Sequence, residues 1–277
     1  MSEKIHPLKK HMRPEVKKTT FCPGCGAGII TQALLRAIDE LGLTMDDCVF
    51  VSGIGCSAWI PSPLLNVDTL HTTHGRPIAY ASGVKLGLPD KHVIVVSGDG
   101  DLSAIGGNHL IHAARRNIDL TVILVNNGIY GMTGGQTAPT TPHGLTTITS
   151  PYGNVEHEFD IARLVTAAGA SYVARWTAYH PRQLTKSIKK GLQKKGFAMI
   201  EVISQCPVQF GRASKQGSAV NMLKNYKQNG VRIEKAAKME AAELQDKIVE
   251  GEFADLDKPE LVASCAAALQ ARTGGNK

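Results

Sequence analysis

The chain has 277 residues, of which 43% are hydrophobic and 20% are charged, and its formal net charge is +7. This composition is typical of a globular protein whose core fits one large or two small domains. No apolar run approaches the roughly 18 residues that a membrane span needs, and no nucleic-acid-binding motif accompanies the basic clusters at 4–18 and 186–195. We therefore expect no contact with membranes or nucleic acids. The basic clusters are interpreted either as solvated helix faces or as a surface for an acidic protein partner.

Residues 1–19 are predicted to form a basic N-terminal tail. The tail lacks the apolar core of a signal peptide, so a cytoplasmic location is expected. The chain contains 6 cysteines, which in a cytosolic protein of this size indicate metal or redox chemistry more than disulfides. Two of them form the run Cys22-Pro23-Gly24-Cys25, ahead of a predicted helix at 29–41. A Cys-x-x-Cys at a helix entry is compatible with a redox pair, half of a zinc site or half of an iron–sulfur site.

The next segments place polar residues at the ends of predicted elements. Residues 48–55 (CVFVSGIG) are predicted to form a buried strand, which is followed by Cys56 and Ser57. A helix is predicted at 77–86, beginning with proline. His74 lies at the turn into this helix, and we interpret it as a residue that meets a phosphate or cofactor.

The stretch 93–132 is predicted to form a βαβ unit. One apolar run ends in Gly98-Asp99-Gly100, a helix-like span follows, and a second apolar run ends in Asn126-Asn127. A right-handed crossover makes the two strands parallel, so Asp99 and Asn127 should face one crevice at the carboxyl edge of the sheet. Carboxylate, amide and carbonyl oxygens suit a Mg²⁺ that is completed by phosphates. A dinucleotide fingerprint is excluded because position 103 is serine, and a Walker motif is excluded because no Gly-Lys-Ser/Thr occurs.

The remaining elements complete an α/β chain with a mostly parallel sheet flanked by helices. A glycine-rich loop at 128–136 is expected to lie against the cofactor. The predicted elements after it are helices at 158–168 and 181–195, strands at 171–175 and 197–204, a loop at 210–220 and a helical arm at 222–272. The predicted division of the chain is a tail at 1–19, a cofactor-binding domain at 20–212 and a C-terminal helical extension at 213–277. Cys48 and Cys265 are predicted to be packed residues without a chemical role.

The other four cysteines fall in predicted loops: Cys22, Cys25, Cys56 and Cys206. The last two follow core strands and could therefore reach the same sheet edge as the predicted Mg²⁺ ligands. Four thiolates can hold a structural zinc or a [4Fe–4S] cluster, and their spacing in the sequence does not decide between these. An electron acceptor, unlike a structural zinc, has a reason to lie beside a cofactor crevice. Unrelated packed thiols are a third interpretation.

Residues 20 to about 212 resemble the β subunits of 2-oxoacid:ferredoxin oxidoreductases. The resemblance is carried by the runs Cys22-Pro23-Gly24-Cys25-Gly26, Gly53-Ile54-Gly55-Cys56-Ser57, His74-Gly75-Arg76, Gly98-Asp99-Gly100-Asp101, Asn126-Asn127 and Cys206-Pro207. Three further segments look most like the 2-oxoglutarate members of the family: Ala58-Trp59-Ile60-Pro61, Ile105-Gly106-Gly107-Asn108-His109 and Tyr130-Gly131-Met132-Thr133-Gly134-Gly135-Gln136.

The resemblance implies the thiamine-diphosphate-binding fold of the diphosphate type, with thiamine diphosphate, Mg²⁺ and one [4Fe–4S] cluster as cofactors. The implied Mg²⁺ ligands are Asp99, Asn127 and the carbonyl oxygen of Ile129. The implied cluster ligands are Cys22, Cys25, Cys56 and Cys206. The residues that would line the thiamine cofactor are Ile54, Gly55, Cys56, Ser57, His74, Gly100, Asp101, Gly131 and Met132.

The resemblance also implies a reaction and its partners. A 2-oxoacid, in the first place 2-oxoglutarate, would be decarboxylated oxidatively with coenzyme A to give succinyl-CoA and CO₂, and electrons would pass through the cluster to ferredoxin. The glutamate that activates the thiamine ring is expected from an α subunit in an α2β2 heterotetramer, so no catalytic residue is assigned within this chain. Three alternatives stay open: a pyruvate or branched-chain 2-oxoacid specificity, a non-oxidative thiamine decarboxylase or synthase, and a non-catalytic zinc-binding scaffold subunit.

Overall fold

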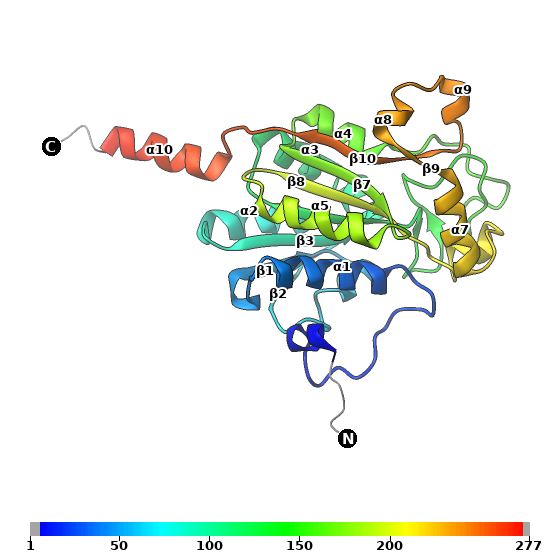
Figure 1. Ribbon diagram of the computed structural model, residues 1–277, viewed down its shortest axis with the longest axis horizontal. Helices are drawn as coiled ribbons and strands as arrows, with labels where there is room; N and C mark the ends of the chain where they lie inside the picture. The colour runs from blue at the N-terminus through cyan, green and yellow to red at the C-terminus, as the bar shows by residue number, and fades with distance from the viewer. Residues whose placement is uncertain (1–5, 274–277) are drawn as a thin grey trace.

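The computed structural model describes residues 6–273, which are built around one eight-stranded sheet (Figure 1). The strand order is β2-β1-β3-β4-β8-β7-β10-β9, and every pairing is parallel except that of β10 with β7. The strands are β1 (Cys48–Ser52), β2 (Asp68–His71), β3 (His92–Gly98), β4 (Thr121–Asn126), β7 (Tyr172–Thr177), β8 (Ala198–Ile203), β9 (Gly230–Arg232) and β10 (Ile248–Asp255). A separate small hairpin pairs β5 (Ile129–Tyr130) with β6 (Gln136–Thr137).

Helices connect these strands and cover both faces of the sheet. They are α1 (Ala27–Glu40), α2 (Pro77–Gly87), α3 (Gly107–Arg116), α4 (Ile161–Ala168), α5 (Pro181–Gln193), α6 (Phe210–Ala213), α7 (Ala219–Asn229), α8 (Ile233–Ala236), α9 (Ala241–Leu244) and α10 (Leu261–Thr273). Short 3-10 turns span Pro7–His11, Met45–Asp47 and Cys56–Trp59, and a π-helical turn spans Gly100–Ile105. Within the described part of the chain, no helix is long and apolar enough to cross a membrane.

The central strands β3 and β4 are mostly apolar, and both of their faces are buried. Successive side chains of a strand point to opposite faces. In β4, Val122 and Leu124 therefore join a core cluster with α2, α3 and α4, while Ile123 and Val125 join a second cluster with α1 and α5. Helices α1 and α5 pack side by side over that second face (Figure 1). A parallel sheet covered on both faces is the arrangement that such continuous apolar runs favour.

The parallel pairing brings the carboxyl ends of four strands to one edge of the sheet. β3 pairs with both β1 and β4, and β4 pairs in turn with β8. The loops that leave this edge carry Cys56 after β1, Asp99 after β3, Asn127 after β4 and Cys206 after β8. The predicted βαβ unit and its crevice are thus confirmed, and the functional residues predicted in these loops meet at one edge.

Several sequence-based predictions were wrong in detail. Strand β2 lies in a segment for which no strand was predicted, and the helix-like span after β3 is divided into a π-helical turn and α3. Residues 210–220 are not a continuous loop, since they contain α6 and the start of α7. Cys48 is buried as predicted, but Cys265 is exposed on α10 and is not packed. Figure 1 shows α10 extending away from the sheet.

The segment 213–277 is not purely helical, because β10 joins the main sheet beside β7. The sequence IVEGEFAD lacks a clear apolar alternation, since acidic residues occupy positions that turn out to be paired. The carboxylate of Glu250 is buried and accepts from the backbone N–H of Thr177, and that of Glu252 pairs with Lys190 at 2.6 Å. The predicted boundary between residues 212 and 213 would therefore divide the strands of one continuous sheet between two domains. Residues 1–5 of the predicted tail and 274–277 of the predicted extension lie outside the described residues.

Candidate cofactor and cluster site

Asp99 is a deeply buried acid of the crevice. It begins the π-helical turn after β3, and its side chain is 2% exposed. Its Oδ2 accepts hydrogen bonds from the backbone N–H of Gly128, at 2.9 Å, and from the hydroxyl of Thr140. Burial nevertheless raises the pKa of this carboxyl to about 6, because its charge is removed from water. A cation bound at this carboxylate would offset that cost, so the environment fits a metal ligand.

The loop after β4 presents the other two predicted metal ligands. Asn127 Oδ1 accepts from the backbone N–H of Ile129 at 3.2 Å, which turns the chain back toward Asp99. The preceding residue, Asn126, donates to Glu201 at 2.7 Å, and Glu201 pairs in turn with Arg175 at 2.7 Å. Glu201 and Arg175 are 1% and 8% exposed. A buried ion pair on the neighbouring strands therefore anchors the loop that carries the predicted Mg²⁺ ligands.

The oxygens of Asp101 bind the protein's own donors. One oxygen accepts from the backbone N–H of Gly75 and contacts the Nδ1 atom of His74, both at 2.7 Å, and the other accepts from the hydroxyl of Ser97. A Cβ atom placed on Gly53 would lie 2.0 Å from this carboxylate, so only glycine fits there. Asp101 thus holds the β1 and β2 loops together and fixes the imidazole of His74.

The predicted cofactor-lining residues do line one cavity. It has an empty volume of about 480 Å³ and is bounded by Ile54, Gly55, Cys56, Ser57, His74, Gly98, Asp99, Gly100, Asp101, Asn127, Ile129, Tyr130, Gly131, Met132 and Thr133. Asp99 and Asp101 supply its negative charge, His74 is its one cationisable side chain, and none of these residues is a glutamate. The cavity can therefore bind a polar, metal-bound group at one end. Its lining residues do not include the glutamate that is expected to activate the thiamine ring.

Sequence reasoning missed two residues that shape this cavity. The ring of Tyr130 lies against Gly100, where a Cβ atom would be 2.3 Å from the ring, and its hydroxyl donates to the Gly100 carbonyl at 3.2 Å. Thr140, the hydroxyl partner of Asp99, comes from the Thr/Pro-rich stretch and is 6% exposed. Its contact joins residues 41 positions apart, and the local pattern around a threonine carries no signal for such a contact.

The four loop cysteines approach the same cavity from its other side. A Cβ atom placed on Gly131 would lie 3.6 Å from the sulfur of Cys206 and 3.7 Å from that of Cys56, so these two sulfurs are within about 7 Å of each other. Burial, followed by the nearby thiols of Cys206, Cys25 and Cys22, raises the pKa of Cys56 to about 11. The pKa of Cys25 is likewise raised, first by burial. The structure thus brings together the four cysteines that the sequence selected.

Two hydrogen bonds tie the Cys22–Cys25 loop to the loop of Cys206. The backbone N–H of Gly26 donates to the carbonyl of Gln205, and the Gln205 amide donates to the carbonyl of Gly24, both at 3.1 Å. Gly24 has a φ of +78° and packs against α7, where its Cβ atom would lie 2.5 Å from that of Ala219. A glycine is needed there because both the backbone angle and the space exclude a side chain.

The spacing of these thiols bears on what they can hold. Four sulfurs around a single zinc, each at about 2.3 Å from the metal, lie about 3.8 Å apart. Among the described residues, no three His, Cys, Asp or Glu side chains are grouped closely enough to hold one metal ion. Ligands of a [4Fe–4S] cluster bind four different irons and stand farther apart. Four thiols are a donor set that suits either centre, so the residues present fit a [4Fe–4S] cluster as well as a single zinc.

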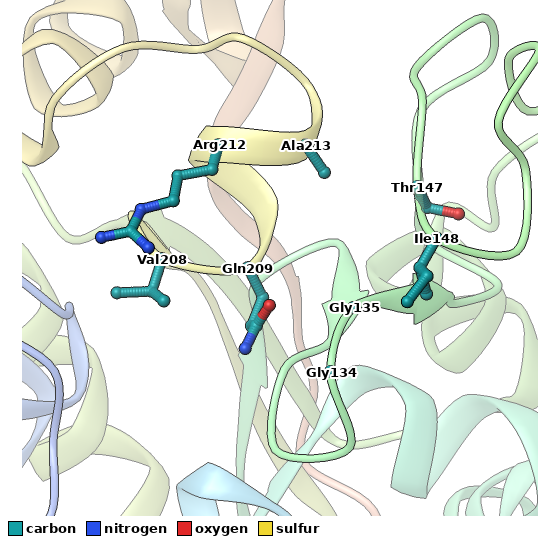
Figure 2. Close-up of a pocket in the computed structure, with 8 residues that line it drawn as sticks. All are labelled: Gly134, Gly135, Thr147, Ile148, Val208, Gln209, Arg212 and Ala213. Carbon is teal, nitrogen blue, oxygen red and sulfur yellow. The ribbon is translucent and has the colours of Figure 1, made fainter.

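A second cavity lies between the glycine-rich loop and α6 (Figure 2). Gly134, Gly135, Thr147 and Ile148 form one side, and Val208, Gln209, Arg212 and Ala213 form the other, around an empty volume of about 740 Å³. The hydroxyl of Thr146 donates to the Ala213 carbonyl at 2.6 Å and joins the two sides. The sequence did not predict this cavity, because α6 was interpreted as loop.

The fold and the crevice place this chain in the class of thiamine-diphosphate enzymes. Residues 53–202 match the family model described as "Thiamine pyrophosphate enzyme, C-terminal TPP binding domain". These residues include the strands that carry Asp99 and Asn127.

Relatives identify the family more narrowly. The chain is 56% identical over 258 residues to the 2-oxoglutarate synthase subunit KorB of Methanocaldococcus jannaschii, covering 93% of this chain and 95% of that one. It is 52% identical to the KorB subunit of Methanothermobacter thermautotrophicus, covering 99% and 96% of the two chains. The solved 2-oxoglutarate:ferredoxin oxidoreductase from Magnetococcus marinus, with 2-oxoglutarate, coenzyme A and succinyl-CoA bound, is 33% identical with a TM-score of 0.86, covering 99% and 92%. The chain belongs to the family of 2-oxoglutarate synthase KorB subunits.

Proposed function

We propose that the chain is the β subunit of a 2-oxoglutarate:ferredoxin oxidoreductase, which works with an α subunit in an α2β2 heterotetramer in the cytoplasm. The complex converts 2-oxoglutarate and coenzyme A to succinyl-CoA and CO₂, and two electrons leave one at a time through a [4Fe–4S] cluster to ferredoxin. The names of the KorB relatives and of the Magnetococcus marinus enzyme support the reaction and the need for a partner subunit.

One observation carries the redox part of the proposal. Gly131 forms the wall between the cavity and the cysteine loops, and a Cβ atom there would touch Cys56, Cys206 and Asn127 at 3.6–3.8 Å. A group bound in the cavity would therefore lie next to a group bound by the thiols. This proximity is what electron transfer requires and what a structural metal site has no use for.

The residues of this chain would bind and orient the cofactor. Thiamine diphosphate, when bound, supplies the carbanion chemistry that a 2-oxoacid decarboxylation needs. Asp99, Asn127 and the Ile129 carbonyl would hold Mg²⁺ at the diphosphate end, where hard oxygen donors meet phosphate. Asp101 would act through His74, whose Nδ1 atom it holds and whose side chain lines the cavity. The cysteine ligands would be Cys22, Cys25, Cys56 and Cys206, and cluster binding would displace their protons because the ligand is the thiolate.

The partner subunit would complete the active site. The lining of the described cavity contains no glutamate, so the ring-activating carboxylate would come from the α subunit. We expect the purified chain alone to show no oxidation of 2-oxoglutarate, and activity to appear when the α subunit is added. Robust turnover by the isolated chain would reject this part of the proposal.

The decisive experiment measures cofactors in the complex purified without oxygen. We expect about four irons per chain, a broad brown absorbance and bound thiamine diphosphate. Cys206→Ser should lose the iron, whereas Cys265→Ser is the matched control because Cys265 is exposed and remote from the cavity lining. Asp99→Ala should lose thiamine diphosphate and keep the iron. Zinc in place of iron would instead favour the scaffold interpretation, and an iron-free protein that holds thiamine diphosphate would favour a non-oxidative enzyme.

Substrate choice is tested with the same complex. We expect the highest kcat/KM with 2-oxoglutarate. A higher kcat/KM with pyruvate or a branched-chain 2-oxoacid would assign the chain to another specificity within the same chemistry.

A further inference from the structure

The four thiols differ in their access to solvent. Cys22 is exposed, Cys25 and Cys56 are partly exposed, and Cys206 is buried at 9%. Cys22 lies in the loop that α7 covers through the contact of Gly24 with Ala219. A cluster held by these thiols would therefore be nearest to solvent at Cys22.

The surface around Cys22 carries more exposed basic than acidic side chains, and Glu15 is the exposed acid nearest to Lys17 in the sequence. Lys17 and Lys18 are exposed just before it, and Arg212 and Lys215 are exposed on the segment after Cys206. The stretches 16–38 and 202–233 contain no aspartate or glutamate at all. Within the described residues, none of these four cations forms an ion pair, in contrast to the lysines discussed below. We call these four residues the Cys22 basic patch.

The fold brings both halves of this patch together. The two segments touch at Gly24 and Ala219; Lys18 is six residues from Gly24 and Lys215 is four residues from Ala219, so their Cα atoms lie within about 22 Å and about 14 Å of this contact. The chain before α1 and the chain leading into α7 also lie on the same side of the molecule, at the right in Figure 1.

The other basic cluster of the sequence has a different environment. On α5, Lys190 pairs with Glu252 and Asp255, and Lys194 pairs with Asp255 and Asp257, at 2.6–2.9 Å. These lysines neutralise the acids of β10 and of the loop that follows it. They therefore contribute little positive electrostatic potential to attract a protein partner. The structure therefore separates two clusters that look alike in the sequence.

From these observations we propose that the Cys22 basic patch is the docking surface for a small acidic electron-carrier protein of the ferredoxin type. The inference rests on the proposed function, since it needs a cluster at the four cysteines. Opposite charges on two proteins raise the rate of productive encounter and orient the partner. Docking at this patch places the carrier over the exposed thiol, on the short route from the cluster to solvent. One electron passes from the reduced cluster to the oxidised carrier at each encounter.

The test reverses charge at the patch in the assembled complex. In Lys17→Glu/Lys215→Glu, kcat/KM for ferredoxin should fall about tenfold or more, mainly through KM, and its dependence on ionic strength should flatten. The rate with methyl viologen, a small acceptor, should not fall. Lys186→Glu/Lys195→Glu, on α5 and just after its end, is the matched control, since it makes the same change in net charge away from the patch, and it should leave the ferredoxin kinetics within about twofold.

Three measurements keep the outcomes distinct. Iron content and subunit assembly are determined for every variant before kinetics. If the parent complex holds no iron, the proposed function fails, and the docking surface fails with it for that reason. If the patch variant keeps its iron and its α subunit but reduces ferredoxin like the parent, only the docking proposal is overturned. Loss of the α subunit from the patch variant would assign this surface to subunit assembly and would also overturn it.

Discussion

The buried pair of Arg175 and Glu201 gives a sharp prediction because it stands beneath the metal loop. Glu201 is 1% exposed and accepts from both Arg175 and Asn126, each at 2.7 Å. Glu201→Met would leave the guanidinium of Arg175 buried without its inner partner. Such a loss costs about 3–5 kcal/mol, because the remaining charge is stranded in a medium of low polarity.

The structure places the expected value at the lower end of this range. Arg175 keeps a second partner, Asp160, whose side chain is 41% exposed and can remain hydrated. A loss of about 3 kcal/mol corresponds to a fall in melting temperature of roughly 6–12 °C for a chain of this size. Thermal unfolding followed by circular dichroism measures this shift.

A double variant separates the stranded charge from the lost packing. In Arg175→Met/Glu201→Met both charges are replaced by apolar side chains of similar volume, which in other buried pairs is close to neutral. We therefore expect the double variant to recover most of the melting temperature that the single variant loses. The reasoning is refuted if Glu201→Met melts within about 2 °C of the parent, or if the double variant is as unstable as the single one.

Two further predictions concern the residues that hold His74. In Gly53→Ala, the new methyl group would clash with the fixed carboxylate of Asp101, so stability should fall by about 1–3 kcal/mol. The control is Gly28→Ala on α1, where an added Cβ would meet no other part of the structure within 4 Å, so this variant should be neutral or slightly stabilising. Equal effects in the two variants would contradict the clash. Asp101→Asn should loosen His74 and weaken thiamine diphosphate binding about tenfold at constant iron content, as measured by titration calorimetry. An unchanged dissociation constant would show that Asp101 does not position the cavity.

The sequence predicted the crevice well because its signals are local. Asp99 and Asn127 each follow an apolar run directly, and the handedness of the crossover places both at one edge. The positions of four cysteines in predicted loops set them apart from the other two, and the structure brings these four together. Runs of this kind need no knowledge of distant contacts.

The parts that were missed depend on distant contacts. Thr140 reaches Asp99 from 41 residues away, and β10 is a strand because β7 offers it an edge while Lys190 and Lys194 pair with its acids. Acidic side chains within IVEGEFAD weaken the strand pattern when the sequence is read alone. The prediction that Cys265 is packed was wrong for a similar reason. An alanine-rich helix packs only where the rest of the fold supplies a surface for it, and the local sequence does not show such a surface.

The two hydrogen bonds between the Cys22–Cys25 loop and Gln205 have a consequence for folding. A cluster bound there would close a loop of about 185 residues, from Cys22 to Cys206, and a crosslink of that length removes chain entropy worth about 5 kcal/mol from the unfolded state. The cluster would then crosslink the segment before α1 to the loop after β8. Oxidative loss of the cluster would leave the Cys22–Cys25 loop joined to the Cys206 loop by these two hydrogen bonds, so damage to electron transfer and local fraying would begin at the same place.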